Sequence, residues 1–325
     1  MTRATVAIGD PVTAAAVPSR PSAVCLRGLT KRYGDRIAVD NLTIDVPTGV
    51  VAGFVGPNGA GKTTTMAMLL GLVTPNEGSG TVLGEPLAAP QSYLGRVGAL
   101  IEGPAFYPGL SGARNLAVLA TVAGHDPAQI PGLLQLVGLT ARGDDRLRSY
   151  SFGMKQRLGI AAALLGDPKL LILDEPINGL DPAGVHEMRG LIGRLSAADR
   201  TVLVSSHVLA ELEQVSDWLI VIDGGRLVFQ GPAGELPDHS GASIVVAPEQ
   251  PDDLDRLRGL LAAAGHDSQT AGERLRIAVG GADPRDLAAA LNRAAGSGGI
   301  VLAELHLTRT SLEDRYLTMT IGGDR

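Results

Sequence analysis

The order of apolar and polar positions along the chain predicts an α/β core. Three short segments are almost continuously apolar and predict strands buried on both faces of a sheet: residues 50–55, 170–173 and 201–205. Residues 41–46 alternate instead and place Leu42, Ile44 and Val46 on one face, which predicts a half-buried antiparallel strand. Helical stretches lie between the apolar segments, beginning with residues 62–72. This order favours parallel central strands with an antiparallel flank.

Two further patterns extend this core. Residues 218–222 and 226–230 flank an Asp-Gly-Gly turn, which predicts a hairpin. A long stretch, residues 88–165, separates two of the buried strands and is mostly helical by pattern. Its predicted helices are residues 115–123, 127–137 and 154–165. Such an insertion predicts a helical subdomain attached to the α/β core.

Both ends of the chain differ from this core. Residues 1–22 are rich in Ala, Pro and Thr and predict a disordered tail. Residues 232–241 contain Pro, Gly, Asp and Ser and predict a linker. Beyond it, residues 242–325 follow a smaller βαββαβ pattern, which predicts an α+β accessory domain of ferredoxin-like type. Its strands are expected at residues 243–246, 266–270, 274–279 and 300–307, its helices at residues 251–264 and 284–294, and a closing helix at residues 311–318.

Composition and charge narrow the class of protein. Hydrophobic residues make up 45% of the 325 residues, which is enough for a sizeable core. The formal net charge of −6 lacks the basic excess of a nucleic-acid binder. No stretch approaches the roughly 18 consecutive apolar residues that a membrane-spanning helix needs. The single cysteine, Cys25, excludes an internal disulfide, and we expect it to be a small buried residue in the first strand.

The segment between the strand at 50–55 and the helix at 62–72 matches the phosphate-binding pattern G-x-x-x-x-G-K-[ST]. Its residues are Gly56, Pro57, Asn58, Gly59, Ala60, Gly61, Lys62 and Thr63, followed by Thr64. Glycines let backbone N–H groups approach a phosphate, and a helix N-terminus adds partial positive charge. The Lys62 ammonium is expected on the β- and γ-phosphates, and the Thr63 hydroxyl on Mg²⁺. The sequence therefore predicts a loop that binds ATP and Mg²⁺.

Two carboxylates follow the buried strand at 170–173, at the end where α/β sheets bind their ligands. Asp174 is expected to hold Mg²⁺ through water. Glu175 is expected to act as general base or to orient the attacking water. By itself, such an acidic pair is an ordinary helix cap. Its combination with the phosphate loop predicts an ATPase of the P-loop class.

With these motifs the chain resembles the ATP-binding subunits of ABC transporters over residues 24–231. Residues 151–157 resemble that family's signature loop, usually written L-S-G-G-Q, and keep Ser151 and Gly153. Four nearby residues depart from the pattern: Tyr150, Phe152, Met154 and Lys155. The physical logic of the loop survives, because Ser151 can cap a helix N-terminus that points at an anion.

Three other residues take roles through the same resemblance. Asp181 closes residues 178–181, which resemble the D-loop that touches the partner subunit in the family. His207 follows the strand at 201–205 and matches the switch histidine that contacts the γ-phosphate, whereas a lone histidine is more often structural. Tyr33 matches the aromatic residue on which adenine stacks, and its alternative role is packing at a strand edge.

Glu102 stands where most members of the family have a glutamine. The resemblance puts this residue near Mg²⁺ and the attacking water, beside the contact with the membrane subunit. Glu102 is then expected to be a third acid near Mg²⁺, together with Asp174 and Glu175. The alternative is a solvated loop acid with no role.

The resemblance also implies partners. In the family, two subunits close head-to-tail, and each signature loop faces the γ-phosphate of its partner's ATP. We therefore expect a second ATP-binding subunit, most simply in a homodimer, and a separate transmembrane permease at whose cytoplasmic face the chain sits. Residues 150–157 and 311–314 resemble drug and antibiotic exporters, including self-protection exporters. The alternatives are a soluble ABC ATPase acting on ribosomes or DNA, and a small-molecule kinase with the same phosphate loop.

Overall fold

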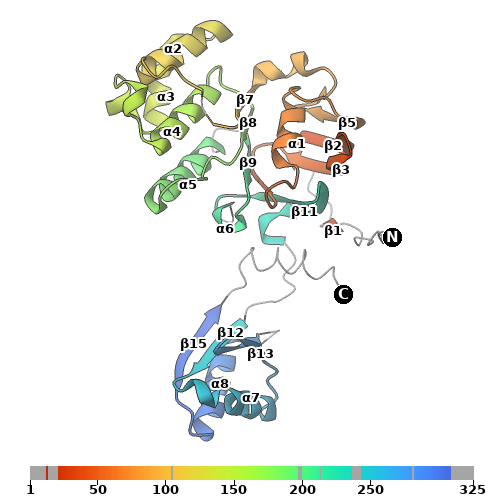
Figure 1. Ribbon diagram of the computed structural model, residues 1–325, viewed down its shortest axis with the longest axis vertical. Helices are drawn as coiled ribbons and strands as arrows, with labels where there is room; N and C mark the ends of the chain where they lie inside the picture. Colours follow the sequence, from red (N-terminus) through yellow and green to blue (C-terminus); the bar gives the residue numbers. More distant parts are fainter. Residues whose placement is uncertain are drawn as a thin grey trace. The chain divides into compact units, whose positions relative to one another are not determined.

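The computed structural model describes residues 12–13, 21–103, 105–196, 200–212, 214–235, 243–279 and 282–308. The chain divides into two compact units, Met1–Leu236 and Pro237–Arg325 (Figure 1). Within the described ranges, no helix is long and apolar enough to cross a bilayer. The first unit contains the phosphate loop and is built around two sheets.

A seven-stranded sheet forms the centre of the first unit, in the order β1-β11-β10-β4-β9-β8-β7. Its strands are β1 (Val12–Thr13), β4 (Val51–Val55), β7 (Val97–Leu100), β8 (Leu170–Leu173), β9 (Thr201–Ser206), β10 (Trp218–Asp223) and β11 (Arg226–Pro232). Strands β10, β4, β9, β8 and β7 are parallel to their neighbours, while β11 pairs antiparallel with β10. Every residue of β4, β8 and β9 is buried, in agreement with their almost continuous apolar pattern.

A second, antiparallel sheet flanks this centre, in the order β3-β2-β5-β6. Its strands are β2 (Ser22–Tyr33), β3 (Arg36–Pro47), β5 (Glu77–Val82) and β6 (Glu85–Pro86). Leu42, Ile44 and Val46 of β3 are buried together with Phe54 of β4 in one apolar cluster. The two sheets therefore share a core, and the predicted antiparallel flank is confirmed.

Helices follow the central strands, and three of them form a layer of their own. Helix α1 (Lys62–Leu69) follows β4, α5 (Pro182–Ser196) follows β8, and α6 (Leu209–Leu212) follows β9. Helices α2 (Gly112–Ala123), α3 (Ile130–Leu136) and α4 (Phe152–Ala163) pack on one another as a helical subdomain (Figure 1). Short 3-10 helices lie at Pro90–Ser92, Leu94–Arg96, Pro127–Gln129, Thr140–Arg142, Leu147–Ser149, Ala233–Glu235 and Pro251–Asp253.

Strand β7 corrects the expected start of the helical subdomain. It lies within residues 88–165 but pairs in parallel with β8 along its whole length, from Val97 opposite Leu170 to Leu100 opposite Leu173. Four residues that include a glycine give no apolar run long enough to be recognised. Pairing with a fully buried neighbour makes them a strand, so the helical layer begins only after the central sheet is complete.

Two expectations for the N-terminal region are also corrected. The tail predicted for residues 1–22 contains β1, whose Val12 and Thr13 pair in parallel with β11. Cys25 is half-buried rather than buried. It alternates along β2 with the buried Val24 and Leu26 and therefore faces the opposite side, beside Asp45. Burial, followed by the nearby Asp45 carboxylate, raises the pKa of the Cys25 thiol.

The second unit is a four-stranded antiparallel sheet with two helices, in the order β13-β14-β12-β15. Its elements are β12 (Ser243–Pro248), α7 (Leu254–Ala263), β13 (Gln269–Ala271), β14 (Arg274–Ala278), α8 (Pro284–Ser297) and β15 (Leu302–Thr308). Leu257 of α7 and Leu291 of α8 pack with Ile244 and Val246 of β12. This is the βαββαβ order of a ferredoxin-like fold. The closing helix expected at residues 311–318 lies outside the described residues.

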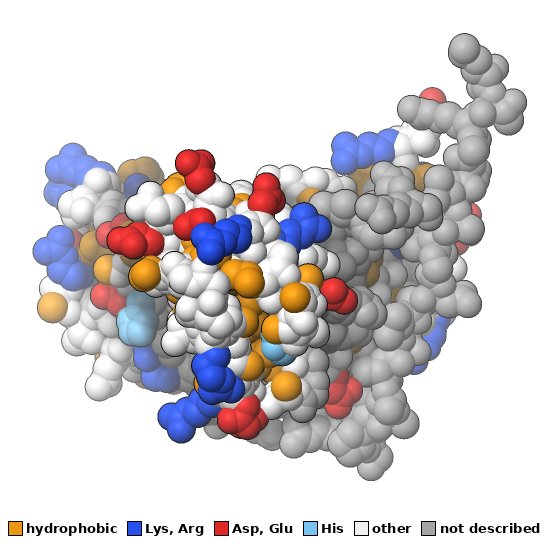
Figure 2. Space-filling view, turned by 90° about the horizontal axis from the view of Figure 1, so that it is seen from below, with side chains coloured by type: hydrophobic (Ala, Val, Ile, Leu, Met, Phe, Trp, Pro, Cys, Tyr) orange, Lys and Arg blue, Asp and Glu red, His pale blue; other side chains and the backbone are white. Residues whose placement is uncertain are grey.

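The surface charge is mixed rather than segregated on the face drawn in Figure 2. There, the described Lys and Arg side chains are interspersed with Asp and Glu side chains, and apolar groups lie between them. Neither sign of charge dominates the described part of this face.

Candidate functional site

The phosphate loop connects β4 to α1, and its glycines have conformations that other residues resist. Gly59 and Gly61 have φ angles of 84° and 102°, in the left-handed region that favours glycine. A Cβ at Gly56 would collide with the carbonyl oxygen of Ile222, and one at Gly61 with that of Ala38. The loop is therefore tightly packed behind and open in front, as a backbone that binds phosphate must be.

A cavity of about 380 Å³ lies in front of this loop. It is lined by Tyr33, Arg36, Ala38, Asn58, Gly59, Gly61, Lys62, Thr63, Thr64, Glu175 and Asn178. These residues come from the β2–β3 hairpin, the phosphate loop with α1, and the loop after β8. The cavity thus joins three separate parts of the sequence at the carboxyl ends of the central strands, where α/β folds bind ligands.

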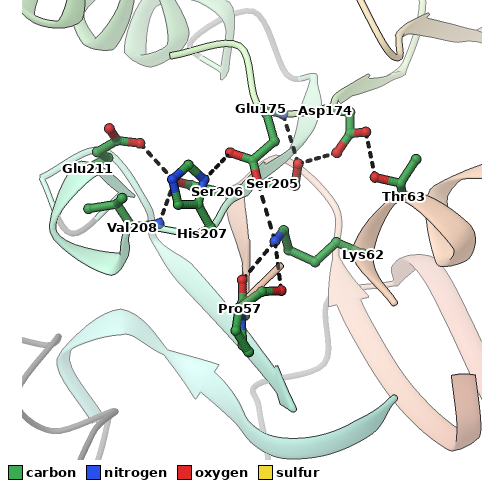
Figure 3. A network of polar contacts seen from close by, with 11 residues as sticks. Pro57, Lys62, Thr63, Asp174, Glu175, Ser205, Ser206, His207, Val208 and Glu211 are labelled. Carbon is green, nitrogen blue, oxygen red and sulfur yellow. Dashed lines mark hydrogen bonds and ion pairs between the residues drawn. The ribbon is translucent and has the colours of Figure 1, made fainter. Parts of the chain in front are cut away.

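The Lys62 side chain is held in place at the back of the cavity. Only 6% of it is exposed, and its Nζ donates to the carbonyl oxygens of Gly56 at 2.7 Å and Pro57 at 3.3 Å. Nζ also lies 3.2 Å from Oε1 of Glu175 (Figure 3). The ammonium is therefore positioned by the loop itself and paired with the carboxylate at the end of β8.

Asp174 is oriented by two hydroxyl groups. Oγ1 of Thr63 donates to its Oδ2 at 2.8 Å, and Oγ of Ser205 donates to its Oδ1 at 2.5 Å (Figure 3). The same Ser205 oxygen accepts the backbone N–H of Glu175 at 2.9 Å. Ser205 is fully buried at the end of β9. It therefore connects the two predicted acids to the neighbouring strand, with both carboxylate oxygens of Asp174 engaged.

Glu175 is held from both sides. While Oε1 faces Lys62, Oε2 lies 2.9 Å from Nδ1 of His207 (Figure 3). Its backbone has a φ of 49°, which is uncommon for a residue with a side chain and directs the carboxylate into the cavity mouth. About a fifth of the Glu175 side chain, 22%, is exposed. The predicted base and the predicted switch histidine are thus in direct contact.

The donor set beside the loop fits the expected Mg²⁺ ion. Mg²⁺ binds oxygen ligands and is usually held by one or two protein groups together with phosphate oxygens and water. The Thr63 hydroxyl and the Asp174 carboxylate supply such oxygens and already lie within hydrogen-bond distance of each other. These are two of the three residues predicted from the sequence to hold the ion, the third being Glu102.

Tyr33 stands at the other end of the cavity, with 49% of its surface exposed. The Lys31 ammonium lies 5.1 Å from the centre of its ring, within the range of a cation–π contact. An exposed ring on a cavity wall is available for stacking, whereas a packing tyrosine would be covered. The neighbouring lining residues Arg36 and Ala38 come from the following strand β3.

The signature residues lie outside this cavity and form a second feature. Ser151 caps α4 by accepting the backbone N–H of Met154 at 3.2 Å, and Asp181 accepts that of Gly184 at 2.8 Å. Gly153, in the first turn of α4, faces Leu180. The exposed Phe152 lies against Gly179, where an added Cβ would be 3.4 Å from the ring. The signature loop and the D-loop are therefore packed together.

Glu102 is not part of the cavity lining in this structure. It is exposed, in a bend two residues after β7, with a φ of 57°. Across the described ranges, no three His, Cys, Asp or Glu side chains are grouped so that they could hold a metal ion. Glu102 therefore does not join Asp174 and Glu175 as a third acid here.

Comparisons with known proteins agree with this geometry. Residues 39–178, from β3 to the loop after β8, match the family described as ABC transporter. Over 311 residues, the chain is 38% identical to a Nod factor export ATP-binding protein of Cupriavidus pinatubonensis, covering 94% of this chain and 92% of that one. The chain belongs to the ABC transporter ATP-binding family. Members of this family are ATPases coupled to transport, so this chain is an ATPase.

Two other relatives match a smaller share of this ABC ATP-binding subunit. A bacitracin transport ATP-binding protein of Bacillus licheniformis is 46% identical over 211 residues, covering 64% of this chain and 69% of that one. A lantibiotic transport ATP-binding protein of Streptococcus pyogenes is 40% identical over 205 residues, covering 63% and 89%. These relatives do not favour an ABC ATPase acting on ribosomes or DNA.

Solved structures give the same fold for 66% of this ABC subunit. The structure of an ATP-binding subunit of an ABC transporter is 30% identical, with a TM-score of 0.59 over 66% of this chain and 92% of that one. Part of the cbiONQ transporter complex, cbiO1 of Clostridium perfringens, is 25% identical, with a TM-score of 0.60. The P-loop ATPase fold predicted from the sequence is confirmed.

Among the residues of the ABC site that were not predicted from the sequence, Ser205 and Arg36 carry polar side chains that matter to the argument. Ser205 is a hydroxyl at the end of the apolar strand β9, two residues before His207, and this position is the signal that could have identified it. Arg36 lines the cavity because a two-residue turn returns the chain opposite Tyr33. Both contacts depend on neighbouring strands, which a motif search does not report.

Proposed function

We propose that this chain binds ATP in the cavity between Tyr33 and the phosphate loop and hydrolyses it to drive a membrane exporter of a drug, antibiotic or peptide. The contact chain from Lys62 through Glu175 to His207 carries this proposal, because it holds a carboxylate at the mouth of a phosphate-binding loop. The similarity to bacitracin, lantibiotic and Nod factor transport proteins supports the class of cargo.

Each of the five polar residues around the phosphate loop has a defined role in the proposed reaction. Lys62 binds the β- and γ-phosphates, and the loop N–H groups surround them. Thr63 and Asp174 hold Mg²⁺, which when bound neutralises phosphate charge. Glu175 accepts the proton of the attacking water or orients it. His207, through Nδ1 on Oε2 of Glu175, holds that carboxylate in one orientation.

A second copy of the chain completes the proposed assembly. Ser151 and Asp181 are exposed and lie outside the cavity lining, so they are available to another subunit. Because one chain carries both an intact phosphate loop and a signature loop, the simplest assembly is a homodimer. We further propose a separate transmembrane permease as partner, no nucleic acid, and a peripheral place on the cytoplasmic face of the membrane.

Substituting Glu175→Gln tests the catalytic assignment. We expect ATP binding to persist, turnover to fall by about 10² to 10⁴, and a dimer to accumulate in size-exclusion chromatography with Mg-ATP. Glu187→Gln is the matched control, since Glu187 is 59% exposed and pairs with Arg157 away from the cavity. Unchanged turnover in the Glu175 variant, or a monomer at every concentration, would contradict the proposal.

Isolation from solubilised membranes tests the partner. The Glu175→Gln protein, loaded with Mg-ATP, should bring down a helical membrane protein. Recovery of ribosomal proteins or DNA in its place would favour a soluble ABC ATPase acting on ribosomes or DNA over an exporter ATPase. Lys62→Ala, which removes the ammonium at the back of the cavity, should greatly weaken nucleotide binding and abolish hydrolysis, and normal ATP turnover by this variant would refute the site.

A further inference from the structure

The β2–β3 hairpin contributes a second residue to the cavity besides Tyr33. Tyr33 and Arg36 are the last paired residues of this hairpin, directly opposite each other across its turn. Opposite residues of an antiparallel pair project to the same side. Both side chains therefore face the cavity that they line.

The Arg36 guanidinium lies at the phosphate loop rather than beside the ring alone. One of its nitrogens, Nη2, would be 3.3 Å from a Cβ placed on Gly59. Since Gly59 and Lys62 line the same cavity, the guanidinium is on the side where the phosphate chain of a nucleotide must lie. Glycine at position 59 leaves space for it.

Charge supports the same position. The charged residues of the lining are Arg36, Lys62 and Glu175, with a net of one positive charge. Lys62 is paired with Glu175 and bonded to two carbonyl oxygens. Arg36, which is exposed, has no hydrogen bond or ion pair within the described ranges. Among the charged lining residues, Arg36 is therefore the cation without a partner in the described part of the chain, and without Arg36 the lining would have no net charge.

We propose that Arg36 is a second phosphate-binding cation of the nucleotide site. The inference rests on the nucleotide cavity of the proposed function and adds a residue outside the motifs described above. A guanidinium presents paired N–H donors that match two phosphate oxygens. The β2–β3 hairpin thereby supplies both the Tyr33 ring for the adenine and the Arg36 charge for the phosphates. The antiparallel flank and the central sheet then bind one nucleotide together.

A charge-matched pair of variants on the same hairpin tests this role. Arg36→Ala is compared with Arg32→Ala, because Arg32 is one residue before Tyr33, faces away from the cavity lining and pairs with Glu77 at 3.8 Å. Each substitution removes one positive charge. Dissociation constants for Mg-ATP and Mg-ADP are measured by calorimetry at low and high salt.

We expect Arg36→Ala to bind both nucleotides about tenfold more weakly at low salt, a difference of about 1.4 kcal/mol, and the loss to shrink at high salt. Arg36→Lys should bind between the parent and the alanine variant. Arg32→Ala should bind like the parent. If Arg36→Ala binds ATP within twofold of the parent, or if Arg32→Ala loses as much, the proposal is wrong. Failure of the parent chain to bind ATP would instead refute the nucleotide site itself.

Discussion

Replacing Ser205 by alanine removes two hydrogen bonds from the centre of the site. The Ser205 hydroxyl is buried, donates to Asp174 at 2.5 Å and accepts the backbone N–H of Glu175 at 2.9 Å. The methyl group of alanine fits the space but cannot replace either bond. The backbone N–H of Glu175 and one oxygen of Asp174 then lose their partner.

The expected loss of stability follows from those two contacts. A hydrogen bond to a charged group contributes about 1.5–3 kcal/mol, and a buried donor left without a partner costs about 1–3 kcal/mol. Asp174 is only partly buried and keeps its bond to Thr63, so the lower part of the combined range applies, about 3 kcal/mol. For a unit of this size, that corresponds to a fall in Tm of about 6–12 °C.

Unfolding can be followed through the single tryptophan. Trp218 lies in β10 with 5% of its surface exposed, so its emission reports on the first unit. Ser216→Ala is the matched control, because its Oγ is buried without a hydrogen-bond partner among the described residues and its removal should change little. We also expect turnover to fall in Ser205→Ala, since Asp174 and Glu175 lose a common support. Equal Tm values for the two variants, with normal turnover, would refute this reasoning.

Three further changes have defined outcomes. Gly61→Ala should weaken ATP binding more than tenfold in titrations, because its Cβ meets the Ala38 carbonyl, while Gly193→Ala, with open space around it, should bind normally. Because the pKa of the Cys25 thiol is raised, less thiolate is present at pH 8, so iodoacetamide should modify the folded chain more slowly than the urea-unfolded chain in mass spectrometry; equal rates would contradict this. Glu102 lies outside the cavity lining, so Glu102→Ala should bind ATP nearly normally. Its proposed place beside the permease predicts that, with the permease reconstituted, Glu102→Ala loses much of its transport-coupled turnover and Glu102→Gln retains it, whereas parental activity in both would make Glu102 a simple surface acid.

The parts of the fold that were predictable are those encoded by continuous local patterns. Strands β4 and β8 and the centre of β9 are short apolar runs, and β3 alternates over residues 41–46. Strand β5 has the sequence EGSGTV and is mostly exposed, so it has no apolar signal and exists through pairing with β2. Strand β7 likewise depends on β8. Pairing with a distant neighbour decides such segments, and periodicity cannot reveal it.

The site divides along the same line. The phosphate loop and the pair Asp174 and Glu175 are short motifs whose chemistry is local, and the structure brings them together with His207. Ser205 and Arg36 act through contacts across strands. Their roles depend on how β9 lies beside β8 and how a hairpin closes, which only the folded chain shows.

Glu175 forms an ion pair with Lys62, and His207 contacts the same Glu175 carboxylate. Under the proposed function, the phosphates of ATP and the Glu175 carboxylate therefore compete for the Lys62 ammonium. Under that function, an incoming phosphate would take the place of the Glu175 carboxylate on Lys62, and part of the binding energy of ATP would offset the loss of that ion pair. The Lys62–Glu175 ion pair thus lowers the affinity for ATP while it holds the carboxylate needed for ATP turnover. A neutral amide competes less for the ammonium, so the Glu175→Gln chain should bind ATP more tightly than its parent in the same titration while hydrolysing it more slowly. Weaker ATP binding by the Glu175→Gln chain would show that the ion pair does not oppose ATP binding.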